Sequence, residues 1–264
     1  MNKLLKNYLG KRSVSDSLLP RVNRESLHDY ILAYLAHPKQ NFLTLEETRF
    51  LKFCMDFEGE TFSAEAQDLW VLFESDSKRN GFFVEFGATN GRSISNTYLL
   101  EKSFGWTGIV AEPNPIWHEA LKTNRKCLVD TRCVYVETGE LVKFSATANA
   151  DIGTITKFKD GDRNKKFRTN AAEINVETVS LRDLLIQSGA PKVIDYLSID
   201  TEGSELDILS SFDFDEFKIK KITVEHNLSK LRKPLHELLS AKGYIRKFDV
   251  TTRARMDDWY IRVD

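Results

Sequence analysis

The segment Gly81-Phe-Phe-Val-Glu-Phe-Gly-Ala-Thr-Asn-Gly91 constrains the fold of this chain most strongly. Its apolar run, residues 82–86, predicts a buried parallel strand. The run ends in Gly87-Ala88, and Gly91 follows just before a predicted helix. A strand, a glycine turn and a helix N-terminus allow a ligand to approach the backbone closely. We therefore expect a nucleotide-type binding site at the carboxyl end of a first strand.

The glycine spacing narrows the class of ligand. It is Gly-x-x-x-Gly, whereas dinucleotide-binding folds carry Gly-x-Gly-x-x-Gly against the pyrophosphate. The turn better suits a ligand whose amino-acid end lies against it. A nicotinamide-dependent oxidoreductase is an alternative that the missing fingerprint disfavours, and a binding assay with both cofactors would decide.

Composition describes an ordinary globular protein. Of 264 residues, 41% are hydrophobic and 29% charged, with a net charge of -1. This charge gives no reason to expect attraction to nucleic acid or a membrane. The three cysteines show no Cys-x-x-Cys spacing, and no apolar run is long enough to cross a bilayer. We expect a cytoplasmic protein with no nucleic-acid partner and no stable membrane insertion; a homo-oligomer is left open.

The pattern divides the chain into two parts. Residues 1–75 are interpreted as an N-terminal arm and helical extension, with a helix over 26–35, a capping box at Thr44–Glu47 and a helix capped by Ser63. Residues 76–264 alternate between strands and helices. Strands are predicted at 82–86, 108–112, 132–136, 193–199, 220–226, 243–249 and 258–263, with a further pair within 134–146. Helices are predicted at 94–103, 115–122, 180–187, 204–211 and 230–241.

This alternation predicts an α/β fold. Repeated βα units with short connections indicate a seven-stranded, mostly parallel sheet covered on both faces. The last two strands, joined by a loop near 251–255, suggest a terminal antiparallel hairpin. The polar stretch 157–170 holds six Lys or Arg against two Asp and is interpreted as a mobile inserted loop.

Five motifs, in order, resemble one family. They are Gly81–Ala88, Ser95–Thr97, Gly105–Asn114, Asp195–Glu205 and Val224–Asn227. Together they resemble the class I S-adenosylmethionine-dependent methyltransferase fold and, within it, the FkbM-type methyltransferases. The resemblance covers roughly residues 65–264 and implies that 76–264 form an S-adenosylmethionine-binding methyltransferase domain. It also implies O-methylation of hydroxyls on sugars or natural products.

The candidate cofactor residues gather at strand ends. Glu112 ends the second strand, where a carboxylate can accept hydrogen bonds from both ribose hydroxyls; Asn114 beside it is a weaker candidate or a helix cap. The resemblance places adenine near Arg132 and Cys133. The full set is Glu85, Gly87, Ala88, Asn90, Gly91, Ser95, Asn96, Glu112, Asn114, Arg132, Cys133 and Asp200.

The candidate catalytic residues are Asp200, Glu202 and His226. Asp200 and Glu202 follow an apolar strand, where neighbouring carboxylates repel one another unless donors or a cation offset their charge. A divalent metal such as Mg²⁺ is therefore an alternative that the sequence leaves open. His226 ends the next strand and is a candidate base for an acceptor hydroxyl.

The expected function is O-methyl transfer from S-adenosyl-L-methionine to a hydroxyl of a saccharide or related small metabolite. The basic stretch 157–170 also raises the possibility of an anionic acceptor. A nucleic-acid methyltransferase is disfavoured because no Asn-Pro-Pro-Tyr-type motif follows the fourth strand. A non-catalytic module that kept the fold is disfavoured by the presence of Asp200 and His226.

Overall fold

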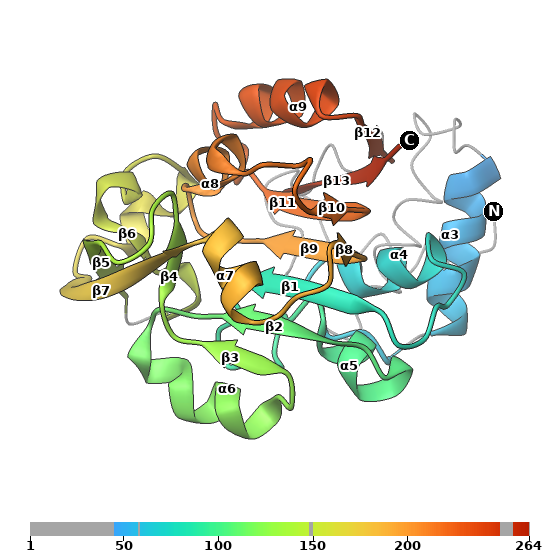
Figure 1. Cartoon of the computed structure of the whole chain (residues 1–264), viewed down its shortest axis with the longest axis horizontal. Helices are drawn as coiled ribbons and strands as arrows, with labels where there is room; N and C mark the ends of the chain where they lie inside the picture. The colour runs from blue at the N-terminus through green and yellow to red at the C-terminus, as the bar shows by residue number, and fades with distance from the viewer. Residues whose placement is uncertain (1–44, 58, 148–149, 249–255, 264) are drawn as a thin grey trace, which may run out of the picture.

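The computed structural model describes residues 45–57, 59–147, 150–248 and 256–263. The arm and the helix expected over 26–35 lie outside these ranges. Within them, a large and a small β-sheet are surrounded by short helices (Figure 1). No helix in the described ranges combines the length and the apolar character needed to cross a membrane.

The large sheet has seven strands in the order β12-β13-β11-β9-β1-β2-β3. Only β13 runs antiparallel to its neighbours β11 and β12, and the other adjacent pairs are parallel. The strands are β1 (Phe82–Phe86), β2 (Thr107–Ala111), β3 (Leu128–Asp130), β9 (Tyr196–Ile199), β11 (Lys221–Glu225), β12 (Tyr244–Lys247) and β13 (Asp257–Arg262). A mixed sheet with a reversed last strand agrees with the prediction; most of the link between β12 and β13 lies outside the described residues.

Helices cover both faces of this sheet. One face packs against α7 (Leu181–Gln187), α8 (Glu205–Ser211) and α9 (Arg232–Ala241). The other packs against α3 (Leu45–Asp56), α4 (Gln67–Phe73), α5 (Tyr98–Phe104) and α6 (His118–Asn124). Successive side chains of a strand point to opposite faces, so Val84 and Phe86 enter the first cluster and Phe83 the second. Burial on both faces explains why β1 reads as one apolar run.

The small sheet has the order β4-β7-β5-β6 and lies beyond the carboxyl ends of β1, β2 and β9 (Figure 1). Its strands are β4 (Cys133–Tyr135), β5 (Leu141–Ala146), β6 (Thr154–Ile155) and β7 (Ala172–Ser180). Two-residue strands β8 (Val193–Ile194) and β10 (Lys218–Ile219) pair separately. Single 3-10 turns complete the fold: η1 (Pro115–Trp117), η2 (Ala150–Ile152), η3 (Thr156–Phe158) and η4 (Arg163–Phe167).

The predicted third strand, 132–136, is wrong in its placement. The third strand of the large sheet is β3, and residues 133–135 form β4 of the small sheet. The physical reason lies at Asp130, whose carboxylate accepts hydrogen bonds from the backbone and guanidinium of Arg132. This local turn ends β3 and redirects the chain.

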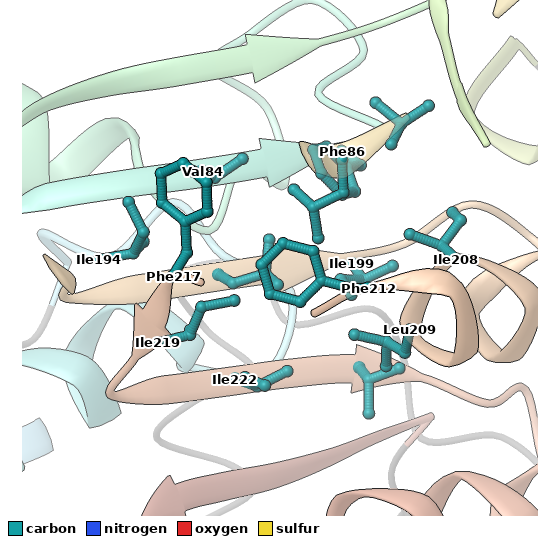
Figure 2. Packing of buried hydrophobic residues seen from close by; sticks show 14 of the residues in the cluster. Val84, Phe86, Ile194, Ile199, Ile208, Leu209, Phe212, Phe217, Ile219 and Ile222 are labelled. Atoms are coloured by element: carbon teal, nitrogen blue, oxygen red, sulfur yellow. The ribbon is translucent and has the colours of Figure 1, made fainter. Parts of the chain in front are cut away.

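Buried aliphatic and aromatic side chains hold the large sheet to its helices, and Ile222 of β11 is one of them (Figure 2). Its exposed fraction is 0%. We predict that Ile222→Ala lowers the free energy of unfolding by about 2–5 kcal/mol, because it removes buried methyl groups and leaves a cavity. The matched control is Ile245→Ala, whose side chain is 45% exposed. Urea denaturation checks both; an equal effect of the two variants would contradict this assignment of the core.

Candidate functional site

A cavity open to solvent, with an empty volume of about 520 Å³ that includes part of this solvent, lies at the carboxyl ends of β1, β2 and β9. The rim of a parallel sheet is where small-molecule sites form. Its lining comes from the loops that follow these strands and from the small sheet. The lining residues are Phe86, Gly87, Thr89, Ala111, Glu112, Pro113, Cys133, Val134, Phe144, Asp151, Gly153, Ile155, Asp200, Thr201, Glu202 and Ser204.

The two glycines of the turn after β1 have different roles. Gly87 has a φ of 73°, and a Cβ atom there would lie 1.9 Å from the backbone oxygen of Asp200. Only glycine therefore lets the loops after β1 and β9 meet at the cavity. Gly91 also has a positive φ, but a Cβ there would meet Leu121 and Arg125. Gly91 serves packing, and it does not line the cavity.

Glu85 binds the loop that follows β1 rather than the cavity. Its buried carboxylate accepts hydrogen bonds from Ser95 Oγ, from the backbone N–H of Asn96 at 2.6 Å and from Thr97 Oγ1. Arg125 adds an ion pair at 3.2 Å. These bonds fix residues 95–97 as a loop, so the predicted helix start at 94 is wrong and α5 begins at Tyr98.

Four more predicted cofactor residues lie outside the cavity lining. Asn96 Nδ2 donates to Ser198 Oγ, and Asn90 Oδ1 accepts from the backbone N–H groups of residues 92 and 93. Ala88 is packed in the second hydrophobic cluster. Arg132 turns away to Asp130 and Gln187.

Glu112 lies in the cavity wall with 4% of its surface exposed. Its two carboxylate oxygens accept hydrogen bonds from the backbone N–H groups of Thr89, at 2.9 Å, and Asn114, at 2.8 Å. Burial raises the pKa of Glu112 to about 7 in spite of these bonds. Asn114 caps η1 through Ile116, as its interpretation as a helix cap predicted, while its Nδ2 is buried with no partner among the described residues.

The small sheet supplies a wall that the sequence did not reveal. Cys133 and Val134 of β4 line the cavity together with Phe144, Gly153 and Ile155. Asp151, on η2, adds a carboxylate to the same wall. Strand alternation indicates β5, but no local signal places Phe144, Gly153 and Ile155 over a site formed by distant strand ends. Cys133 was a predicted cofactor residue, and burial raises its pKa to about 12, so it is a neutral thiol.

Asp200 and Glu225 form a carboxyl pair at the cavity rim. Parallel pairing of Val224 with Ile199 sets the register that brings these two residues side by side. Their side chains share a hydrogen bond. Burial, followed by the charge of Glu202, raises the pKa of Asp200 well above its usual range. Burial and the charge of Asp200 do the same for Glu225. Each of the two carboxyl groups therefore holds its proton more tightly than an exposed carboxyl group does.

Glu202 is held by donors from three directions. Its carboxylate accepts hydrogen bonds from Arg168 Nη2 at 2.6 Å, Asn164 Nδ2 at 3.1 Å and Asn227 Nδ2 at 2.7 Å. Burial raises the pKa of Glu202 to about 7, although the charge of Arg168 acts in the opposite direction. Glu202 lines the cavity, but most of its hydrogen-bonding capacity is used within the protein.

The carboxylates of Asp200, Glu202 and Glu225 are close enough to share a metal ion, with oxygens within 4.8 Å of one another. Asn227 Nδ2, however, donates to both Glu202 and Glu225 at 2.7 Å. This amide, the guanidinium of Arg168 and the hydrogen bond between Asp200 and Glu225 already offset the charge that a cation would balance. The donor set therefore fits hydrogen bonding better than it fits Mg²⁺.

His226 follows the last residue of β11 and lies outside the cavity lining. Its Nδ1 accepts a hydrogen bond from the backbone N–H of Leu228, and its Nε2 faces Asp258 at 3.6 Å. Although Asp258 is buried, His226 and two arginines hold the pKa of Asp258 well below its usual range. Strands β9 and β11 are adjacent, as expected, but one step along a strand reverses the side chain. Glu225 therefore takes the place beside Asp200.

The basic stretch 157–170 connects β6 to β7 and contains most of η3 and all of η4. Arg168 of this stretch is buried and paired with Asp162 and Glu202. Lys157 contacts Tyr135 and Asp207.

Several solved structures are similar to this chain at low identity. The methyltransferase FkbM from Methylobacillus flagellatus KT is 13% identical with a TM-score of 0.44, covering 89% of this chain and 58% of its own. The chain thus spans less than two thirds of that structure. The precorrin-6y C5,15-methyltransferase from Geobacter metallireducens GS-15 is 14% identical with a TM-score of 0.37, covering 68% and 71%. A human methyltransferase 10 domain containing protein is 14% identical with a TM-score of 0.39, covering 83% and 97%.

No curated protein matches the sequence. The model of the methyltransferase FkbM domain matches residues 85–246, which is more than half of the chain. This range contains the last two residues of β1 and all of β2, β9 and β11, the strands that carry the cavity and the carboxyl pair. The chain therefore belongs to the FkbM methyltransferase family.

Proposed function

We propose that this chain is an S-adenosyl-L-methionine-dependent O-methyltransferase whose acceptor is a hydroxyl of a saccharide or related small metabolite. The observation that carries the proposal is the presence, at one sheet rim, of a cavity lined by Glu112 and by Asp200, whose carboxyl group is paired with that of Glu225. The first feature suits a nucleoside, and the second suits removal of a hydroxyl proton.

The residues of the cavity fit this cofactor. Each oxygen of Glu112 accepts one backbone hydrogen bond, and a carboxylate oxygen keeps a second lone pair for a ribose hydroxyl. The missing side chain at Gly87 brings the loop close to Asp200 and leaves room for the amino-acid end of the ligand. Cys133, Val134 and Ile155 offer apolar walls to adenine.

The carboxyl pair would act on the acceptor. When bound, S-adenosyl-L-methionine supplies an electrophilic methyl group. Asp200, which lines the cavity, would accept the proton of the acceptor hydroxyl, with Glu225 sharing the charge through their hydrogen bond. Most of the rate enhancement would come from positioning, because the protein would hold the acceptor oxygen in line with the methyl group that this oxygen receives.

We infer an uncharged acceptor. Asp200, Glu202 and Glu225 gather at the rim, and Asp257 adds further negative charge to the pair. Arg168 is engaged by Asp162 and Glu202. An anionic acceptor would meet repulsion without a free guanidinium from Arg168 to offset it, whereas the hydroxyls of a neutral saccharide can donate to these carboxylates.

The cofactor assignment predicts the effect of Glu112→Ala. The variant should bind S-adenosylhomocysteine more weakly by about 1.5–3 kcal/mol, because hydrogen bonds to a charged acceptor are lost. Isothermal titration calorimetry measures the difference. The control is Glu119→Ala on the exposed side of α6, which should bind like the wild type. Equal affinity of Glu112→Ala and the wild type would show that Glu112 does not hold the ribose.

The catalytic assignment predicts the effect of Asp200→Asn. Turnover should fall by about a hundredfold or more, because the group that accepts the proton is lost. Since a base must be ionised and the pKa of Asp200 is raised, wild-type turnover should increase as pH rises through that pKa. His226→Asn should keep this pH profile. If His226→Asn loses the rising limb while Asp200→Asn keeps it, the base is His226.

A further inference from the structure

Residues 150–168, which we call the cover segment, form one wall of the cavity. Asp151, Gly153 and Ile155 line it from this side. The segment contains η2, β6, η3 and η4. Next to it, residues 201–204 form the turn after β9, and three of them also line the cavity. The proposed ligand would lie against both elements.

One side chain connects the parts of the cover segment to the turn. Arg168 is 3% exposed. Its Nε donates to the backbone oxygen of Ile152 at 2.8 Å, and its Nη1 donates to that of Lys159 at 3.2 Å. Nη1 also pairs with Asp162 at 2.9 Å, and Nη2 pairs with Glu202 at 2.6 Å. A single guanidinium therefore binds three points of the cover segment and the turn.

Further contacts join the same two elements. Thr154 Oγ1 donates to the backbone oxygen of Glu202 at 2.8 Å, and Asn164 Nδ2 donates to the Glu202 carboxylate. Gly203 has a φ of 126°, and a Cβ there would lie 2.9 Å from the Cβ of Phe158. Phe158 thus packs directly against the turn, so a movement of the cover segment would also displace Glu202.

The ion pairs cannot be broken at low cost. Removing the guanidinium would leave Asp162 and Glu202 as buried carboxylates without their cation, which is strongly unfavourable. Lysine keeps the charge but lacks the planar fork that reaches several acceptors at once. Arg168→Lys should therefore retain part of the attachment between the cover segment and the turn, and Arg168→Met should retain none of the attachment that Arg168 provides.

We propose that Arg168 is a positioning residue that holds the cover segment against the 201–204 turn and thereby retains the bound cofactor. The identity of the ligand rests on the proposed function, whereas the attachment of the segment does not. Without Arg168 the segment should open more often. Because opening releases a bound ligand, the loss should appear mainly as faster dissociation.

Hydrogen–deuterium exchange on the free, full-length protein tests the attachment. Arg168→Met should speed amide exchange in peptides covering 150–168 and 201–204 at least several-fold, with Arg168→Lys intermediate. The control is Lys165→Met, an exposed residue of η4, which should exchange like the wild type. Unchanged exchange in Arg168→Met overturns the inference. Should Arg168→Met not fold, Asn164→Ala removes one contact to Glu202 and must give the same change to a smaller degree; no change in that variant also overturns it.

Stopped-flow binding of S-adenosylhomocysteine tests retention. We expect Arg168→Met to raise the dissociation rate constant at least tenfold, Arg168→Lys less, and Lys165→Met not at all. If the wild type binds S-adenosylhomocysteine and Arg168→Met releases it at the wild-type rate, the inference about Arg168 is overturned and the proposed function is not. Absence of wild-type binding overturns the proposed function, and the exchange experiment still decides whether Arg168 holds the segment.

Discussion

Strands β1 and β9 lie side by side, and the loops that follow them meet where a Cβ on Gly87 would be 1.9 Å from the backbone oxygen of Asp200. This approach fixes the floor of the cavity. It brings Asp200 to the rim, and the adjacent register of β11 brings Glu225 to Asp200. Any larger residue at 87 would separate the two loops, so the cavity and the carboxyl pair depend on the same backbone contact.

The buried charge of the site is balanced within the protein. Asp200 and Glu225 share a hydrogen bond, while Arg168, Asn164 and Asn227 donate to Glu202. Such groups are costly to bury without partners. The same partners position the groups: Arg168 connects the wall of the cavity to the turn that carries Glu202. Stability and geometry therefore rest on one network, which is why single substitutions within it need matched controls.

Local sequence signals predicted much of this arrangement. The apolar run predicted β1, and the strand ends predicted the positions of Gly87, Glu112 and Asp200. These three residues all line one cavity. The direction of the side chains at the end of β11 was harder to predict, because the neighbours Glu225 and His226 point to different sides of that strand. The third strand was predicted in the wrong place because the turn that ends β3 is held by a hydrogen bond from the Arg132 side chain to Asp130. Strand periodicity gives no sign of such a turn. The wall formed by Phe144, Gly153 and Ile155 could not be predicted, since only tertiary packing brings the small sheet to the rim.

A crystal structure of the protein with S-adenosylhomocysteine would show whether the cavity binds the cofactor. We expect the ribose hydroxyls to lie within hydrogen-bonding distance of Glu112, with adenine between Cys133 and Ile155 and the sulfur facing Asp200. We also expect Arg168 to hold the cover segment closed over the ligand. A ligand bound elsewhere, or a Glu112 carboxylate that still contacts only the backbone of Thr89 and Asn114, would contradict the account.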